Sequence, residues 1–256
     1  MRYEDYWKIN STYGNLFYER AIGQKEEMEC SKALCKILKP IYKEGMSVLD
    51  VGCGTGHYLR SLIEHLDEDI KYTGVDITKE YMVKAKKAFK NYSFKVGNIH
   101  CLEFLTNEFD IVTCNNVLMH LPVPPTKAIS ELLRVSKDYV VIRTPIGKRN
   151  YIIKQVNDFN DELDKDFENK LPKQEHKLID ENGEPICWHY LNLYTKRFFE
   201  DLICEINPDY TVNFIQDTFW KELKTKSKTN TATEIIDGKQ VCGNVVLDWH
   251  FIVIRK

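Results

Sequence analysis

Three glycines at alternate positions follow an acidic residue where an apolar run ends, in the segment VLDVGCGTG. They are Gly52, Gly54 and Gly56, and the acid is Asp50. Glycine permits backbone angles that a Cβ atom forbids, and it lets a ligand lie against the main chain. The third glycine of a dinucleotide motif would fall on His57, and the Gly-Lys-Ser/Thr ending of a phosphate-binding loop is absent. The turn therefore predicts a cofactor that has no pyrophosphate.

A second acid, Asp76, ends the apolar segment YTGVD, about 20 residues past the glycines, as in dinucleotide-binding folds. A carboxylate at this place accepts hydrogen bonds from both hydroxyls of a ribose. The spacing therefore indicates a ligand that contains a ribose.

Short apolar segments alternate with amphipathic segments, which is typical of a parallel sheet covered by helices on both faces. The predicted strands are Ser47–Val51, Lys71–Asp76, Ser93–Val96, Phe109–Cys114, Tyr139–Arg143, Thr211–Gln216 and Leu247–Ile254. The predicted helices are Glu26–Lys39, Tyr58–Leu66, Lys79–Lys90, Pro125–Ser136 and residues 195–206. The pattern predicts an α/β fold with a Rossmann-like, seven-stranded, mostly parallel sheet.

We expect residues 1–256 to form a single domain, which suits a chain of this length. Three segments depart from the regular alternation. Residues 1–25 are rich in aromatic side chains and are a candidate N-terminal lid, although ordinary packing of a helix explains them equally well. Residues 146–194 are expected to be an insertion that covers the substrate. Residues 221–244 are low in apolar content and are expected to be flexible.

Four segments, VLDVGCGTG, GVDIT, VGNIHCLEF and FDIVTCNNVLMHLP, resemble the motifs of class I S-adenosylmethionine-dependent methyltransferases. The resemblance extends over about residues 47–145 and implies S-adenosylmethionine as the cofactor and S-adenosylhomocysteine as its product. It implies that Asp50 and the glycine turn face the methionine part of the cofactor and that Asp76 binds the ribose.

The same resemblance places the remaining cofactor-binding residues. It implies that Ile77 packs on the adenine, that Asn98 and Ile99 lie at the adenine edge, and that Asn115 contributes to the cofactor site. The family more often has an aspartate where this chain has Asn98. The amide carbonyl of asparagine can still accept a hydrogen bond from the adenine amino group.

The segment CNNVLMH also restricts the reaction. Enzymes that methylate nucleobase amines or glutamine amides resemble one another in an Asn/Asp-Pro-Pro-aromatic motif at this place, and the segment lacks that motif. Asn115 and Asn116 also cannot supply the carboxylates that a metal-dependent O-methyltransferase needs. We therefore expect methyl transfer that needs no metal, to either an oxygen or a nitrogen acceptor.

Histidines are the candidates for a general base, because imidazole titrates near neutral pH. His120 follows the predicted fourth strand, whereas His176 and His189 belong to the insertion after the fifth strand. We expect His189 to be the base because the family builds its acceptor pocket from that region. Packing or exposure to solvent is the alternative for each of the three.

The candidate substrate-binding residues are aromatic or basic. They are Tyr6, Trp7, Tyr13, Arg143, Lys148, Arg149 and Tyr190. The three basic residues are expected just beyond the predicted fifth strand, where they would bind an anionic substrate or remain solvated.

The formal net charge of -2 argues against a nucleic-acid partner. The segment MRYEDYWKIN lacks the charged-then-apolar pattern of a signal peptide, and no apolar run approaches the roughly 20 residues that span a membrane. We expect a cytoplasmic monomer or homodimer that methylates a small polar molecule, such as an anionic or a sugar- or nucleotide-linked one. The alternatives are a methyltransferase for protein side chains and a non-catalytic subunit that binds S-adenosylmethionine.

Overall fold

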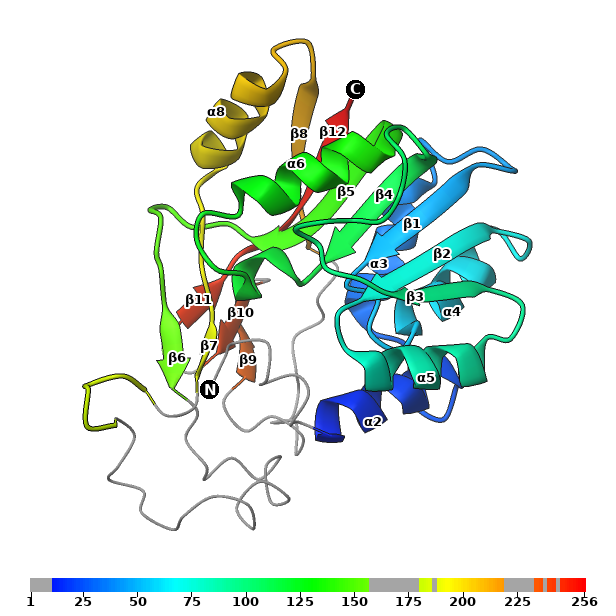
Figure 1. Ribbon diagram of the computed structural model, residues 1–256, viewed down its shortest axis with the longest axis horizontal. Helices are drawn as coiled ribbons and strands as arrows, with labels where there is room; N and C mark the ends of the chain where they lie inside the picture. The colour runs from blue at the N-terminus through cyan, green and yellow to red at the C-terminus, as the bar shows by residue number, and fades with distance from the viewer. Residues whose placement is uncertain (1–10, 157–179, 186–187, 219–232, 237–238, 243–244) are drawn as a thin grey trace.

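The computed structural model describes residues 11–156, 180–185, 188–218, 233–236, 239–242 and 245–256. Its main sheet has seven strands in the order β3-β2-β1-β4-β5-β12-β8 (Figure 1). The strands are β1 Ser47–Val51, β2 Lys71–Asp76, β3 Ser93–Val96, β4 Phe109–Asn115, β5 Ser136–Pro145, β8 Thr211–Gln216 and β12 Trp249–Arg255. Strands β1 to β5 are parallel, and β12 is antiparallel to both β5 and β8. The predicted fold class is confirmed.

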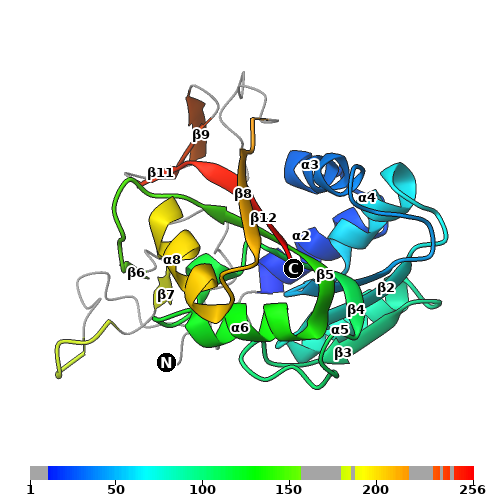
Figure 2. The same cartoon turned by 90° about the horizontal axis from the view of Figure 1, so that it is seen from above.

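Helices cover both faces of this sheet (Figures 1 and 2). Their bounds are α2 Ser11–Ala21, α3 Glu29–Leu38, α4 His57–His65, α5 Lys79–Ala88, η1 Leu118–His120, α6 Thr126–Val135 and α8 Lys196–Ile206. Helices α3, α4 and α5 share one hydrophobic cluster with the sheet, and α6 and α8 share another on the opposite face. Helix α2 packs against α4 and α5.

The central strands are apolar almost throughout because both of their faces are covered. In β1, Val48 belongs to the cluster beneath α3 and α4, and Leu49 belongs to the cluster beneath α6 and α8. Both side chains are fully buried. Because parallel strands end at the same edge of the sheet, β1, β2 and β4 bring the residues that follow them close together.

Two small antiparallel sheets lie beyond the carboxyl ends of β4 and β5 (Figure 1). One pairs β6 (Lys154–Val156) with β7 (Trp188–Tyr190), and both strands belong to the predicted insertion 146–194. The other contains β9 Thr233–Ile236, β10 Lys239–Cys242 and β11 Val245–Leu247. Strands β9 and β10 fall within the segment that was expected to be flexible.

The predicted strand Leu247–Ile254 is interrupted at Asp248. The carbonyl of Asp248 accepts a hydrogen bond from the backbone N–H of Ile146 at 2.9 Å, and β11 pairs with β10 instead of with the main sheet. In the part of the chain that the structure describes, no helix is long and apolar enough to cross a membrane.

Candidate cofactor and acceptor site

The turn between β1 and α4 adopts the backbone conformation that its glycines were expected to permit. The φ angles of Gly52, Gly54 and Gly56 are 80°, 57° and 84°, all in the left-handed region. A Cβ atom on Gly52 would lie only 2.2 Å from Cγ2 of Val117, which follows β4. A side chain there would therefore be excluded by both conformation and space.

Asp76 holds this turn through its side chain. Its Oδ2 accepts a hydrogen bond from the backbone N–H of Gly54 at 3.0 Å, and its Oδ1 accepts one from the backbone N–H of Thr78 at 2.8 Å. Burial raises the pKa of the Asp76 carboxyl, and these two N–H groups oppose the rise. Each carboxylate oxygen can accept more than one hydrogen bond. The geometry is thus compatible with the ribose interaction that the sequence predicts for Asp76, and the half-buried Ile77 lies beside it.

Asp50 is almost completely buried at the end of β1. Its carboxylate accepts hydrogen bonds from the hydroxyls of Tyr72 at 2.9 Å and Thr113 at 3.0 Å. Burial raises the pKa of Asp50 to about 6, although both hydroxyls oppose this shift. A deprotonated Asp50 would be stabilised further by a cationic ligand group such as an ammonium.

Asn115, at the end of β4, lies beside the Asp50 carboxyl without reaching hydrogen-bond geometry. Its side chain is buried, and neither amide atom has a hydrogen-bond partner among the described residues. A buried amide without a partner costs free energy, and a polar ligand would relieve that cost. The glycine turn, the two acids and this amide together fit an amino-acid-bearing nucleoside such as S-adenosylmethionine.

The loop after β3 places Asn98 and Ile99 differently from each other. Ile99 is buried, whereas Asn98 is exposed and its Oδ1 accepts a hydrogen bond from the backbone N–H of His100 at 2.9 Å. The carbonyl expected to accept from an adenine amino group is therefore already bonded within its own loop. Nδ1 of the His100 ring also lies 3.0 Å from the same oxygen. An adenine amino group would therefore compete with this ring for the second lone pair of Oδ1.

Helix α2 covers the glycine turn with aromatic side chains. Phe17 stacks on His57 with ring centroids 4.6 Å apart, and Tyr13 stacks on Phe17 at 6.1 Å. Burial lowers the pKa of His57 to about 3, so this ring is neutral. The position of Tyr13 suits the expected lid, while the other two aromatic candidates, Tyr6 and Trp7, lie outside the described residues.

Two histidines that are distant in the sequence meet beyond the carboxyl end of β4. His120 is the last residue of η1, and His189 lies in β7. The centroids of their two imidazole rings are 5.6 Å apart. Nδ1 of His120 lies 2.7 Å from the carbonyl oxygen of Tyr190. Desolvation lowers the pKa of His120 to about 4 and that of His189 to about 3. Both rings are thus neutral at physiological pH.

Asn192 fixes the chain after β7 against η1. Its backbone N–H donates to the carbonyl of Met119 and its amide donates to the carbonyl of Leu121, both at 2.8 Å. Its amide oxygen accepts from the backbone N–H of Ile153 at 3.2 Å. Asn192 is fully buried and was not singled out from the sequence. The local sequence signal of a buried position is that this asparagine stands between two leucines.

The remaining candidates do not all meet at this place. Lys148 and Arg149 are exposed after β5, and His176 lies outside the described residues. Neighbouring strand residues point to opposite faces, so the ring of Tyr190 lies on the other side of β7 from His189. There it packs edge-on against Trp188, with centroids 4.7 Å apart. Tyr190 thus contacts the histidine pair through its carbonyl.

Arg143 lies within β5, so the expectation that it follows the strand is wrong. Its guanidinium is buried, pairs with Asp217 at 2.7 Å and lies 4.0 Å above the ring of Trp249. Its Nη1 also donates to Oδ1 of Asn116. β5 is two residues longer at this end than predicted, which places Arg143 in the interior, where its partners satisfy its charge.

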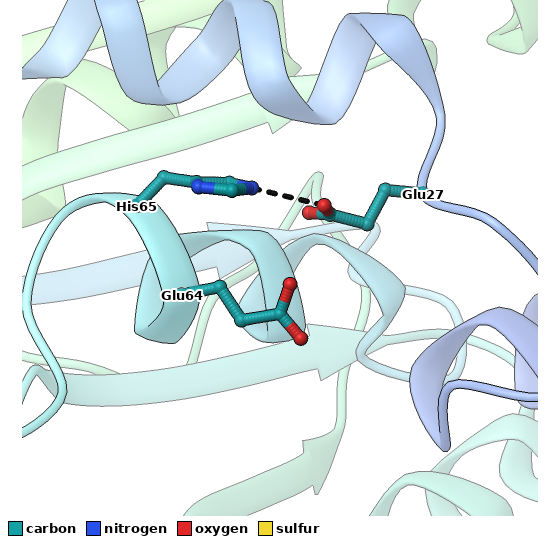
Figure 3. Close-up of side chains that lie close together, drawn as sticks. All are labelled: Glu27, Glu64 and His65. Atoms are coloured by element: carbon teal, nitrogen blue, oxygen red, sulfur yellow. Dashed lines mark hydrogen bonds and ion pairs between the residues drawn. The ribbon is translucent and has the colours of Figure 1, made fainter.

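A group of three possible metal ligands lies at the far end of α4 from the glycine turn. Glu27, Glu64 and His65 bring their ligand atoms within 4.8 Å of one another (Figure 3). His65 Nε2 lies 2.9 Å from Glu27 Oε2, and Glu64 accepts from Arg60 at 2.8 Å. These contacts tie the segment before α3 to α4, and they account for the cluster as a surface ion-pair network.

Comparisons with known proteins agree with this geometry. A methyltransferase domain family matches residues 42–184, more than half of the 256-residue chain. An uncharacterized methyltransferase of Schizosaccharomyces pombe is 34% identical over 119 residues, which are 42% of this chain and 41% of that protein. The mitochondrial ubiquinone biosynthesis O-methyltransferase of Saccharomyces cerevisiae is 32% identical over 127 residues, 43% of this chain and 40% of that protein. The chain thus spans less than half the length of these curated relatives.

Among solved structures, magnesium protoporphyrin IX methyltransferase from Synechocystis with bound S-adenosylhomocysteine has a TM-score of 0.54. The likeness covers 99% of this chain and 97% of that chain at 14% sequence identity, and so it shows the fold alone. The match to the family and the order of strands lead to one assignment. The chain belongs to the class I S-adenosylmethionine-dependent methyltransferases.

Proposed function

We propose that this protein transfers a methyl group from S-adenosylmethionine to a hydroxyl of a small polar molecule. The observation that carries the proposal is the convergence of two sites. The glycine turn with Asp50 and Asp76 fits the cofactor, and Val117, which packs against that turn, lies one turn before His120. The backbone N–H of His120 donates to the carbonyl of Val117 at 2.9 Å, so the acceptor side is built directly on the cofactor side.

In this proposal, Asp76 binds the ribose hydroxyls, and Asp50 and Asn115 bind the polar methionine end. Asn98 and Ile99 lie at the adenine edge. When bound, the cofactor supplies a methyl group on a positively charged sulfur, which an acceptor displaces in line. The chain's own contribution is to orient the acceptor, exclude water and take up its proton.

The geometry favours His120 over His189 as the base. A carbonyl only accepts hydrogen bonds, so Nδ1 of His120 carries the proton in its contact with Tyr190. In the neutral ring, Nε2 then carries the lone pair that can accept a proton. His189 packs beside this ring and keeps it desolvated.

The low basicity of His120 restricts which kind of hydroxyl can give up its proton to this ring. A ring whose pKa is about 4 takes a proton from an acidic hydroxyl more readily than from an aliphatic alcohol. A phenolic hydroxyl, with a pKa of about 10, is therefore the acceptor that this site suits best. The match to a protein named as an O-methyltransferase supports the same acceptor atom.

Calorimetric titration with S-adenosylhomocysteine tests the cofactor assignment. We expect one molecule to bind per chain, and we expect NAD to give no binding heat because the turn lacks the third glycine of a dinucleotide motif. Absence of heat at high micromolar S-adenosylhomocysteine, or equal binding of NAD, would contradict the proposal.

A further inference from the structure

The side chain of Arg143 reaches the turn between β4 and η1. Its Nη1 donates to Oδ1 of Asn116, the first residue after β4. Asn116 in turn donates from Nδ2 to the hydroxyl of Tyr58 at 3.2 Å, and Tyr58 is the second residue of α4. One carboxamide therefore joins β5 to the helix that follows the glycine turn.

The turn after β4 connects the two sides of the proposed site. Before Asn116, Asn115 places its buried amide beside the carboxyl of Asp50. After Asn116, Val117 packs against the glycine turn, and η1 with His120 begins at the next residue. Asn116 itself has a φ angle of +60°, in the left-handed region that residues other than glycine rarely adopt. A change of backbone conformation at Asn116 would therefore displace the cofactor contacts and the proposed base together.

The guanidinium of Arg143 is fixed by residues from the far strands of the sheet. Its Nε donates to Oδ2 of Asp217 at 2.8 Å, and its Nη2 lies 2.7 Å from the same oxygen. The ring of Trp249 in β12 lies 4.0 Å from the guanidinium carbon, and Trp249 shares a hydrophobic cluster with Met119 of η1. An acid, a carboxamide and an aromatic ring thus hold the guanidinium in one orientation.

Stability alone does not account for a charged pair at this depth. The side chains of Arg143 and Asp217 are each only 1% exposed. Removing water from two charges costs about as much free energy as their attraction returns, so apolar residues of similar size are often equally stabilising. What the pair adds is direction, because a planar guanidinium donates from several nitrogens at fixed angles. With Asp217 bound to Nε and Nη2, Nη1 is directed to Asn116.

We propose that Arg143 is a positioning residue that holds the turn after β4 through Asn116, so that the cofactor contacts and η1 keep their places. This inference rests on the proposed function and assigns a role to a residue that acts through another. In-line methyl transfer depends on a precise placement of the acceptor against the methyl group. The ion pair with Asp217 then serves the geometry of the site more than the stability of the fold.

Removing both charges together tests this role without leaving one of them unpaired in the interior. The variant carries Arg143→Met and Asp217→Leu, and the control is Lys137→Met, an exposed residue near the other end of β5 that pairs with Asp110. We expect the double variant to keep a urea midpoint near that of the wild-type protein and to bind S-adenosylhomocysteine about 10-fold more weakly. The control should bind it as the wild-type protein does.

A double-mutant cycle with Asn116→Gly shows whether Arg143 acts through Asn116. Substitutions within one hydrogen-bonded network are not additive, whereas independent ones are. In the Asn116→Gly background, we therefore expect replacement of the ion pair to cause no further loss of affinity for S-adenosylhomocysteine. Arg143→Lys keeps a charge beside Asp217 but lacks the second set of donors, and it should weaken binding in the same way.

Two results would overturn the proposal. The first is an unchanged dissociation constant for S-adenosylhomocysteine in the double variant, and the second is a loss of equal size with and without Asn116→Gly, which would assign Arg143 a purely structural role. If the double variant does not fold, Arg143→Lys takes its place in the same cycle. Absence of S-adenosylhomocysteine binding by the wild-type protein is distinguishable from both results, because it contradicts the proposed function itself.

Discussion

The imidazole ring of His120 lies 5.6 Å from that of His189, centroid to centroid, and its Nδ1 is held at 2.7 Å from the carbonyl of Tyr190. The carbonyl fixes which ring nitrogen of His120 carries the proton. The pair therefore has one oriented imidazole and one neighbour that shields it from water.

Replacing His120 and His189 in turn distinguishes the oriented imidazole, which is the proposed base, from the neighbour that shields it. In His120→Asn, the side-chain amide can still donate toward the Tyr190 carbonyl, but no lone pair replaces that of Nε2. Turnover should fall by about 100- to 10,000-fold, the usual contribution of a general base, while affinity for S-adenosylhomocysteine stays nearly constant. Steady-state kinetics and calorimetry measure the two effects, and His189→Gln should lower turnover less. A larger loss in His189→Gln would make His189 the base.

Stability should decrease in mild acid. Burial lowers the pKa values of His57, His120 and His189 to about 3, 4 and 3, from 6.5. The unfolded chain thus binds more protons below pH 6.5, and the free energy of unfolding falls as the pH falls, by up to about 1.4 kcal/mol per pH unit for each histidine. Asp50, whose pKa is raised to about 6, offsets the effect of one histidine below that pH.

Urea unfolding at a series of pH values from 7.5 to 4.5 measures this dependence. We expect a steeper loss of stability for the wild-type protein than for His189→Gln, which has one buried titratable ring fewer. Equal unfolding free energies at pH 7 and pH 5 would show that these rings are not buried in the neutral form.

Asp76→Ala should weaken cofactor binding through two losses. It removes the acceptor of the Gly54 N–H and, in the proposed site, the acceptor of the ribose hydroxyls. We expect a loss of about 1.5–3 kcal/mol in the binding free energy of S-adenosylhomocysteine, as for hydrogen bonds to a charged group. Calorimetry measures it, with the exposed Asp209→Ala as a control. An unchanged dissociation constant would remove Asp76 from the ribose site.

Asn116 offers a test of how the turn after β4 is held. Its φ angle is +60°, its backbone N–H donates to the carbonyl of Arg143 at 2.9 Å, and its side chain accepts from the Arg143 guanidinium. Glycine accommodates this φ angle but has no side chain to accept that hydrogen bond. We expect Asn116→Asp to keep the affinity for S-adenosylhomocysteine and Asn116→Gly to reduce it.

Thermal unfolding of both Asn116 variants separates binding from folding. If Asn116→Gly binds S-adenosylhomocysteine as tightly as the wild-type protein does, only the backbone conformation of the turn after β4 is required. The contact of the Asn116 side chain with Arg143 then has no part in positioning the cofactor site.

The sequence predicted the sheet well because its strands are apolar runs bounded by polar or glycine residues. The bounds of β1, β2, β3 and β8 agree with the prediction. The break at Asp248 was not predictable, since it depends on a hydrogen bond from Ile146 and on pairing with β10, both remote in sequence. Strands β9 and β10 were missed because their polar composition resembles that of a loop.

The site was predictable where a local motif specifies it and unpredictable where it depends on long-range contacts. The glycine spacing specified the turn, and the role of Asp76 follows from its place at the end of a strand. No local pattern could show that His120 meets His189 or that Arg143 faces a buried acid. Each of these depends on which elements pack together.

The most direct test of the central proposal is methyl transfer from isotopically labelled S-adenosylmethionine to a panel of small phenols, aliphatic alcohols and amines. We predict labelled product with phenolic acceptors, none with aliphatic alcohols, and loss of the phenolic product in His120→Asn. Transfer to amines alone, or to phenols at an undiminished rate in His120→Asn, would contradict the proposed hydroxyl acceptor and its base.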